Sequence, residues 1–576
     1  MLQSCGETGG ASDSGPNRMA LCGIPVTIDV MVSMAGSADQ AATIADLLRF
    51  VMPSVLAGTK PTWPPDAFAL AASVLKRSGA YTEVANKWPP SAYRPRGSWH
   101  GRIEALADQW RKTCIRKQPW PDQVDKWWGV VLASRDLALE LIVKKRQLVV
   151  ALVGIVAASD HACFNAGFLL LGEGDKFDDR TVRNLSIRQS LCEGVDSTRA
   201  IVLPKCHNPL TGMTLRSLTH NLALWNTPEV APIWEQIGRR RIEPGMNILL
   251  LPWPLVVAPN AFRPVDVHLG LTLSDDTGLF AYDMPGAEPD VQKIKALIDA
   301  AKDLVGDVDA IVFPELSMTH ADFMAVLKVI DGPLLIAGVG TAQSGREYGA
   351  NEVAVAVDSP QDAEPFLQSK HHRWRMDSPQ LAQYGVGHAM TEKVAWWEAI
   401  RVESRECRFF SSSEWLTFCV LICEDLARQD PVAELVRAVG PNLVIALLLD
   451  GPQIPDRWSA RYATVLAEDP RSSVLTLTCA GMVDLSRFQH GGGPRSIGLW
   501  KDAYSKATQI VLEPGSDAIV LKLTREMAKE WTADGRHDYE ATGYLKLSGI
   551  YQVASKGASE VRRKKPVGSK AKSRKP

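Results

Sequence analysis

Three residues that lie far apart in the sequence have side chains that together could break a bond to an amide or nitrile carbon. Glu315 follows an apolar run that ends in proline, Lys370 precedes two histidines, and Cys423 stands between an apolar run and two acids. A thiolate can attack the carbon, a carboxylate can carry the thiol proton to the departing amine, and an ammonium can stabilise the developing negative charge. This set of residue types is suited to hydrolysis through a thioester.

Each of the three residues also has an ordinary explanation. An acid after a strand is most often a helix cap or a surface residue, and most lysines are solvated. A free cysteine is commonly buried as a small apolar residue, which suits Cys419 and Cys479. For Cys423 taken alone, the two interpretations as nucleophile and as core residue are equally good.

The elements that must position these residues belong to an α/β pattern. Short apolar runs predict strands buried on both faces at 247–251, 310–313, 334–339, 352–357, 417–422, 443–448 and 474–478. Helical patterns alternate with them at 290–304, 320–329, 431–438 and 458–468. Glu315 then follows one strand at a sheet edge, because proline cannot continue a central ladder. Cys423 ends another strand before a helix N-terminus, where the helix dipole stabilises a thiolate.

In order and context, the three segments resemble the Glu, Lys and Cys motifs of the nitrilase superfamily of carbon–nitrogen hydrolases. They read Val312-Phe313-Pro314-Glu315, Ser369-Lys370-His371-His372 and Val420-Leu421-Ile422-Cys423-Glu424-Asp425. Residues 335–339 and 351–356 are similar to the strand pair between Glu and Lys, and 460–463, 473–479 and 495–498 to a later helix and two strands. The Cys-Glu-Asp wording is similar to the glutaminase domains of NAD synthetases, but no ATP-pyrophosphatase loop of the Ser-Gly-Gly-x-Asp-Ser type is present, so NAD synthesis is not assigned.

The resemblance implies a four-layer α-β-β-α sandwich over residues 245–550, and it assigns roles to the site. Glu315 would act as general base and then acid, Cys423 would form the thioester, and Lys370 with the backbone N–H of Glu424 would hold the oxyanion. The substrate would be a small amide or nitrile, with no cofactor and no metal. By analogy with family members that pair through their outer helices, we expect a homodimer.

Two features depart from the family pattern. Many members carry a second glutamate shortly beyond the lysine, where this chain offers Asp377 beside Ser378. The 53 positions from Lys370 to Cys423 also exceed the usual interval. Trp374, Arg375, Trp396 and Trp397 lie in this interval, and they either line a pocket or pack in a lid or interface.

Residues 19–243 are predicted to form a mostly helical region, with helices at 41–50, 103–110 and 127–143 and a buried helix at 148–158 that is too short to cross a membrane. A turn at Glu243-Pro244-Gly245 marks the expected boundary.

Within this region, Arg216 and His220 are four residues apart and could share one helical face. The spacing of His161, Cys163, Cys206 and His207 is not that of a standard zinc site, so no metal is assigned. The tryptophans and basic residues interleaved over 63–128 favour a helical core over a surface for nucleic acid, because acids are mixed among them.

The two ends and the cysteines complete the prediction. Residues 1–18 lack the pattern of a secretory signal and are expected to form a disordered tail. Ten cysteines without a Cys-x-x-Cys pair predict reduced thiols and a cytoplasmic protein. The formal net charge is −1, yet residues 556–576 hold nine Lys or Arg against one acid. This basic tail, 554–576, is interpreted either as a disordered solubilising segment or as an arm for nucleic acid or an acidic protein.

Two functions from different classes follow. The first is a hydrolase that cleaves a non-peptide carbon–nitrogen bond with a Glu-Lys-Cys triad. The alternative is a nitrilase-like sensor, scaffold or effector, for example in bacterial defence, whose N-terminal region and basic tail bind a partner. An activated Cys423 should label faster with a thiol-reactive probe than the other nine cysteines, whereas a binding-only protein should show no such bias.

Overall fold

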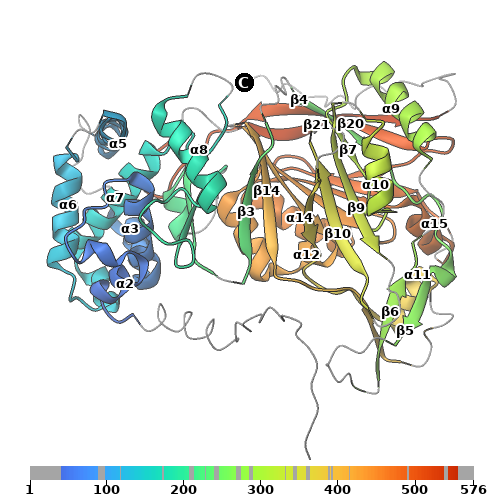
Figure 1. The fold of residues 1–576 in the computed structure, drawn as a ribbon, viewed down its shortest axis with the longest axis horizontal. Helices are drawn as coiled ribbons and strands as arrows, with labels where there is room; N and C mark the ends of the chain where they lie inside the picture. Colours follow the sequence, from blue (N-terminus) through green and yellow to red (C-terminus); the bar gives the residue numbers. More distant parts are fainter. Residues whose placement is uncertain are drawn as a thin grey trace, which may run out of the picture. The chain divides into compact units, whose positions relative to one another are not determined.

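The computed structural model shows a mixed α/β chain with several sheets and helices (Figure 1). The structure describes residues 41–555 except for 89–97, 117–118, 171–173, 207–212, 228, 239–244, 267–273, 275, 285–289, 331, 342–346, 358–363, 387–389, 391–392, 414, 490–491 and 538–542. The expected N-terminal tail, the basic tail from residue 556 onward and Glu243-Pro244 therefore lie outside the described residues. No helix in the described part of the chain is long and apolar enough to cross a membrane.

Helices dominate the described residues from 41 to 188. They are α2 (Ile44–Val51), α3 (Pro64–Ser78), α4 (Val84–Lys87), α5 (Trp99–Arg116), α6 (Asp122–Ala133), α7 (Arg146–Ala162) and α8 (Lys176–Arg188). The buried helix predicted at 148–158 is confirmed as α7, whose residues from Leu148 to Asp160 are all buried except the half-buried Val150.

The single helix predicted at 127–143 is wrong, because two elements occupy this stretch. Helix α6 ends at Ala133, and a 3₁₀ segment, Leu139–Lys144, follows a turn. Carbonyls of this turn accept hydrogen bonds from the first N–H groups of α2, Ala45 N to Arg135 O at 2.8 Å and Ile44 N to Leu137 O at 3.2 Å. These N–H groups have no partner within their own helix, so the turn satisfies a helix end that a continuous α6 would leave open.

The pairing of Arg216 and His220 on one helical face is also wrong. Arg216 lies in a 3₁₀ turn, Leu215–Leu218, which ends before His220. The guanidinium of Arg216 instead pairs with Asp469 and donates to the carbonyl of Arg437 at 2.7 Å. Long-range ion pairing, which residue spacing does not show, decides the position of this side chain.

Three short strands follow the helices: β1 (Ile201–Pro204), β2 (Leu222–Trp225) and β3 (Ala231–Gln236). The first two pair with each other, whereas β3 runs parallel to β14 (Glu406–Ser413). β3 thus precedes residue 245, the expected boundary, yet lies in a sheet with strands that follow it.

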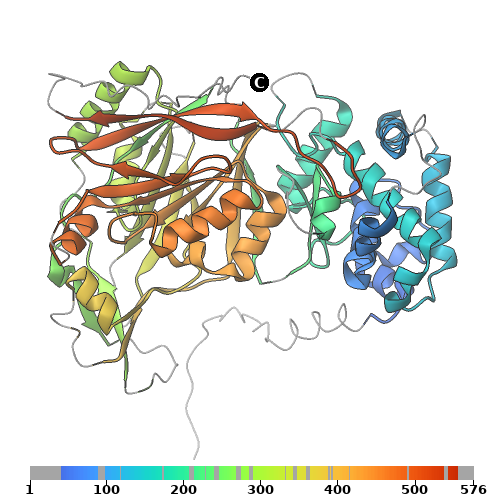
Figure 2. The same ribbon diagram turned by 180° about the vertical axis from the view of Figure 1, so that it is seen from behind.

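That sheet has seven strands, in the order β19-β18-β17-β16-β15-β14-β3. Its other members are β15 (Leu416–Ile422), β16 (Leu443–Leu448), β17 (Ser473–Thr478), β18 (Ser496–Lys501) and β19 (Thr508–Val511). Helix α14 (Trp458–Glu468) contacts β17 and β18 (Figure 2). Short helices α12 (Glu424–Ala427) and α13 (Glu434–Val439) follow β15, and α15 (Ala480–Gln489) follows β17.

A second sheet has eight strands, in the order β11-β10-β9-β7-β4-β20-β21, with β8 paired to β9. The strands are β4 (Gly245–Leu250), β7 (Ala310–Val312), β8 (Met318–Thr319), β9 (Leu334–Thr341), β10 (Ala350–Ala356), β11 (Phe366–Ser369), β20 (Ala518–Met527) and β21 (Gly543–Val553). Helix α9 (Val291–Val305) contacts β4, β20 and β21, and α10 (His320–Leu327) contacts β9. The predicted strands from 247 to 478 and the helices between them are confirmed in position, within a few residues at their ends.

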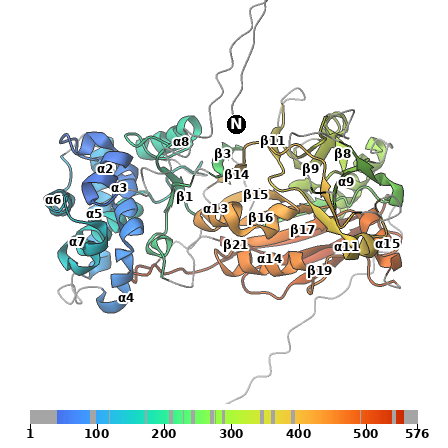
Figure 3. The same cartoon turned by 90° about the horizontal axis from the view of Figure 1, so that it is seen from below.

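Hydrogen bonds from side chains join the two large sheets, whose strands are seen from below in Figure 3. Gln368 of β11 donates to the carbonyl of Val420 in β15 at 2.9 Å. Ser473 of β17 donates to the carbonyl of Leu545 in β21 at 2.6 Å. Strands that carry the Lys and Cys motifs therefore lie against each other.

A smaller sheet has four strands, β12-β13-β6-β5. Two separate segments form it: β5 (Phe262–Val265) and β6 (Thr277–Tyr282) come before α9, whereas β12 (Arg375–Asp377) and β13 (Ala395–Glu398) follow Lys370. Helix α11 (Ser378–Tyr384) connects β12 to the segment before β13. This added structure accounts for the long interval between Lys370 and Cys423. Its apolar side chains share a core with Leu316, Leu449 and Cys479, which lie around Glu315.

Candidate active site

Glu315 is placed by a tight crossing of the chain over β9. After β7 the backbone leaves the sheet at Pro314, and the Glu315 side chain is buried. Gly338 of β9 donates to the Pro314 carbonyl at 3.0 Å. A Cβ on Gly338 would lie 2.4 Å from the Glu315 Cα, so only glycine allows this approach. The next residue, Leu316, has φ of 47°, an uncommon value that the surrounding contacts must hold.

Lys370 lies between two carboxylates. Its Nζ donates to Oε1 of Glu315 at 2.8 Å and to Oε2 of Glu398 at 2.7 Å, and all three side chains are buried. Asn351 donates through Nδ2 to Oε1 of both glutamates at 2.8 Å. The other Glu315 oxygen accepts from the backbone N–H of Leu449 at 2.7 Å. Buried charges of this kind persist only when paired and hydrogen-bonded, as here.

Glu398 is a second buried partner of Lys370 that the motifs do not predict. The interpretation that the chain offers only Asp377 beyond Lys370 is wrong, because Asp377 caps α11 by accepting from the Gln380 N–H at 3.1 Å. Glu398 ends β13, after the inserted β12 and α11, and reaches Lys370 from there. An acid at the end of the apolar run Ala395-Trp396-Trp397 was the one available signal.

Cys423 stands at a strained turn between β15 and α12. Its backbone has φ of 45° and ψ of −104°, fixed by hydrogen bonds from its N–H to Leu447 O at 2.9 Å and from Leu426 N to its carbonyl at 3.0 Å. Non-glycine residues rarely adopt positive φ, and such strain gathers at functional sites.

Asp425 connects the Lys motif to the Cys motif through hydrogen bonds. Its carboxylate accepts from the backbone N–H of His371 at 3.1 Å and contacts Nδ1 of His372 at 2.9 Å. The segment that presents Lys370 is thus held to the turn that presents Cys423. The two histidines have a positioning role that the motif alone did not show.

Burial raises the pKa of the Cys423 thiol well above its usual range, and Glu315 raises it further while Lys370 opposes. The expected stabilisation of a thiolate by a helix N-terminus is therefore wrong: α12 has four residues and opens with two acids, Glu424 and Asp425. Burial also raises the pKa of Glu315, against the effect of Lys370. Burial alone would lower the pKa of Lys370, but Glu315 and Glu398 raise it, so the ammonium stays charged. To act as a nucleophile, a thiol whose pKa is shifted in this direction would need a base to take its proton.

A cavity of about 350 Å³ opens over Cys423. Its lining comes from Trp374 and α11, from α12, from the end of β16 and from the start of α14: Trp374, Gln380, Gln383, Tyr384, Cys423, Glu424, Ala427, Arg428, Leu449, Asp450, Arg457, Trp458 and Tyr462. Of the four residues proposed for a pocket, Trp374 alone is in this lining. Trp396 belongs to the apolar core, and Arg375 stacks on Trp397.

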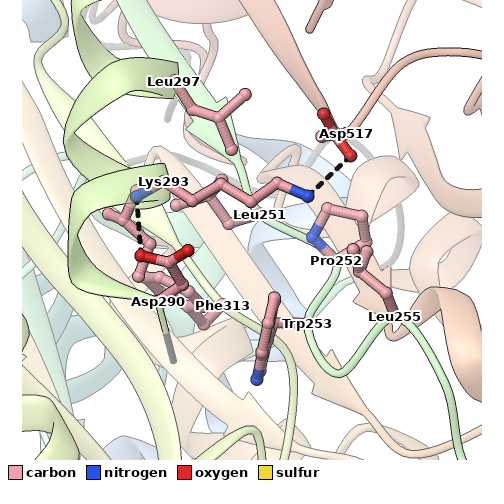
Figure 4. A pocket seen from close by; sticks show the side chains of 10 residues that line it. Leu251, Pro252, Trp253, Leu255, Asp290, Lys293, Leu297, Phe313 and Asp517 are labelled. Atoms are coloured by element: carbon pink, nitrogen blue, oxygen red, sulfur yellow. Dashed lines mark hydrogen bonds and ion pairs between the residues drawn. The ribbon is translucent and has the colours of Figure 1, made fainter. Parts of the chain in front are cut away.

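A second hollow lies apart from these residues, between α9 and the segment after β4 (Figure 4). It is lined mainly by apolar side chains such as Leu251, Trp253 and Leu297, and an ion pair between Lys293 and Asp517 at 2.9 Å borders it. Its volume of about 10 Å³ leaves room for one water at most. It is too small for a substrate.

No group of three or more His, Cys, Asp or Glu side chains among the described residues is arranged to hold a metal ion. Cys163 and Cys206 are buried free thiols, and His207 lies outside the described residues.

Comparison with known proteins finds no matching family model and no matching curated protein. Solved structures give fold-level likenesses. Nit3 of Saccharomyces cerevisiae, a member of branch 10 of the nitrilase superfamily, is 12% identical over 50% of this chain and 92% of its own, with a TM-score of 0.32. A carbon–nitrogen hydrolase superfamily protein of Xanthomonas campestris with an arsenic adduct in its active site is 12% identical over 48% and 90%, with a TM-score of 0.29. A glutamine-dependent NAD(+) synthetase of Cytophaga hutchinsonii is 10% identical over 48% and 42%, with a TM-score of 0.26. At these low values the chemistry must be argued from the site itself.

Proposed function

We propose that the chain is a carbon–nitrogen hydrolase of the nitrilase type that cleaves small amides through a thioester on Cys423. The observation that carries the proposal is the position of Lys370 Nζ, 2.8 Å from Glu315 and 2.7 Å from Glu398, beside a strained cysteine at a cavity. We further propose that the two large sheets, with α9 and α10 on one and α14 on the other, form a four-layer α-β-β-α sandwich.

Glu315 serves as the proton carrier in this proposal. The Cys423 thiol gives its proton to a Glu315 oxygen as sulfur bonds to the amide carbon, and the carbonyl oxygen becomes an oxyanion. When the carbon–nitrogen bond breaks, Glu315 returns the proton and ammonia or amine leaves. Water then attacks the thioester, passes its proton to Glu315, and releases the acid and the thiol.

Two donors suit the oxyanion. Lys370 has three N–H groups, of which two donate to Glu315 and Glu398, while the third has no partner among the described residues. The backbone N–H of Glu424, the first residue of α12, has no acceptor within its own helix. Donors that are already oriented stabilise a developing charge without reorganisation.

Glu398 and Asn351 act as positioning residues. Glu398 accepts from Lys370 and from the Trp374 N–H at 3.0 Å, and Asn351 ties it to Glu315. With two carboxylates beside it, Lys370 stays an ammonium and does not compete with Glu315 for the thiol proton.

The test is intact-mass analysis with an ammonia-release assay on a panel of amides and nitriles. Wild type should show a thioester adduct and ammonia release, and Cys423→Ala should show neither. Cys419→Ala is a matched control, since Cys419 is buried in β15, the strand that ends just before Cys423, and its removal should leave both signals. Because the thiol pKa is raised, acylation by substrate separates an enzyme from a binding protein better than alkylation of the resting thiol does. The proposal fails if Cys423→Ala keeps full ammonia release.

A further inference from the structure

The charge, polarity and aromatic character of the residues that line the cavity over Cys423 limit which substrates can bind there. Its lining includes Cys423 and Leu449, whose N–H donates to Glu315, so the scissile amide of a substrate must lie beside these two residues. The acyl group of the substrate must then point toward α11 and the start of α14.

Charged groups in these walls are already paired. Arg457 donates to Asp450, and Tyr384 donates its hydroxyl to the same carboxylate. Arg428, at the exposed rim, pairs with Glu424 at 3.3 Å. A charged acyl group would lose its hydration without gaining an unpaired partner, which is costly. The walls therefore favour a neutral acyl group.

One neutral donor remains in the wall. The Gln383 amide oxygen, in the orientation that satisfies Arg457, accepts from Nη1 and Nη2 of Arg457 at 3.0 and 3.1 Å, and the same orientation also satisfies its nitrogen. The Gln380 Oε1 accepts from the Asp377 N–H at 3.1 Å, whereas the Gln380 amide nitrogen has no partner among the described residues. This nitrogen suits a hydrogen-bond acceptor on the ligand.

Three aromatic side chains give the cavity flat apolar surfaces. Trp458 and Tyr462 are one turn apart on α14, half-buried, with ring centroids 6.4 Å apart. Trp374 lies buried on the α11 side, held edge-on by Phe280 and Tyr384. Flat rings gain from offset or edge contacts with such side chains beyond the area that they bury.

We propose that the cavity selects neutral primary amides whose acyl group is a flat aromatic or heteroaromatic ring with a hydrogen-bond acceptor on the side away from the carboxamide. This inference rests on the proposed amidase function. Gln380 recognises the acceptor, and Trp458 and Tyr462 contact the ring.

The experiment measures kcat/KM of the full-length wild type for seven probes: benzamide, the three pyridinecarboxamides, cyclohexanecarboxamide, succinamate and glycinamide. The best pyridinecarboxamide should exceed benzamide by about five-fold, as for one neutral hydrogen bond. Benzamide should exceed cyclohexanecarboxamide, and both charged amides should be at least about ten-fold poorer than benzamide. Faster turnover of succinamate or glycinamide than of every ring amide would overturn the inference while leaving the amidase function standing.

Variants locate the recognition. Gln380→Leu should bring the ratio of pyridinecarboxamide to benzamide close to one, and Gln509→Leu, in β19 and outside the cavity lining, should not change it. Trp458→Leu should lower the ratio of benzamide to cyclohexanecarboxamide, with exposed Trp531→Leu as its control. Unchanged ratios in Gln380→Leu and Trp458→Leu would contradict the inference.

Binding to Cys423→Ala, measured by calorimetry with the same probes, separates this inference from the proposed function. If the ring amides bind this variant but wild type hydrolyses none of them, the selectivity stands and the amidase function fails. If they neither bind nor react, both are overturned.

Discussion

Two buried clusters of charged residues in the described part of the chain differ in their surroundings and in how fully their hydrogen-bonding groups are paired. In the first, Glu315, Lys370 and Glu398 lie beside Cys423 and its cavity. In the second, Arg536 pairs with Asp160 and with Asp534, which also accepts from Trp99 at 2.8 Å. Arg536 and Asp534 belong to the segment between β20 and β21, and Asp160 and Trp99 to α7 and α5.

The two clusters differ in whether their buried charged groups keep a hydrogen-bonding group that could bind a ligand. Asp160 accepts from the backbone N–H groups of His220, Asn221 and Leu222 as well as from Arg536. Arg536 also donates to the carbonyls of Ala157 and Leu218. In the first cluster, Lys370 keeps one donor and Cys423 faces open space. Burial of charge alone therefore does not indicate a site, whereas a spare donor beside a cavity and a strained cysteine supports the proposed one.

Among the variants, substitutions of Cys423 should have the largest effect on activity. Both Cys423→Ala and Cys423→Gly should lose activity by at least about 10⁴-fold, because the thioester cannot form. Cys423→Gly should nevertheless be more stable than Cys423→Ala by about 1 kcal/mol, since only glycine accepts φ of 45° without strain. Amide hydrolysis and chemical unfolding of both variants test this. Greater stability of the alanine variant would show that the turn relaxes.

Glu315→Gln should lower kcat/KM by about 10²- to 10⁴-fold, the usual contribution of general acid–base catalysis. The amide keeps the size of the side chain, so the fold should be retained, as circular dichroism can check. A loss below ten-fold would mean that another group carries the proton.

Arg536→Met should instead lower the stability of the fold and leave the activity unchanged. Removing one partner of a buried ion pair costs about 3–5 kcal/mol of stability, because Asp160 and Asp534 stay buried with less compensation. Activity per folded molecule should remain that of wild type. Urea unfolding together with kcat/KM measures both, and a loss of activity at full stability would tie this cluster to the active site.

The pH dependence of kcat/KM should show an acid limb with a midpoint above 4.5, the ordinary pKa of glutamate, because the pKa of Glu315 is raised and its protonated form accepts no proton. A loss of folding stability on protonation of Glu315 does not explain this acid limb. A raised folded-state pKa gives stability below the unfolded pKa, and this stability is lost as pH rises. No basic limb is expected below pH 9, since the pKa of the Cys423 thiol lies well above this ordinary value. A basic limb near neutrality would contradict this assignment.

The sequence by itself determined the local features of this protein. Alternating short apolar runs and helical patterns located the strands and helices from 247 to 478, and the motifs singled out Glu315, Lys370 and Cys423. These features depend on residues close together in the chain, where the repeat of strand or helix is visible.

Only the tertiary structure decided how these residues act. It brought Glu398 to Lys370 across an inserted sheet, placed β3 beside β14, and set Gln383 and Trp458 in one cavity. It also reversed the expected shift of the Cys423 pKa. Burial and long-range contacts set each of these outcomes, and both depend on residues far apart in the chain, which residue type and spacing do not encode.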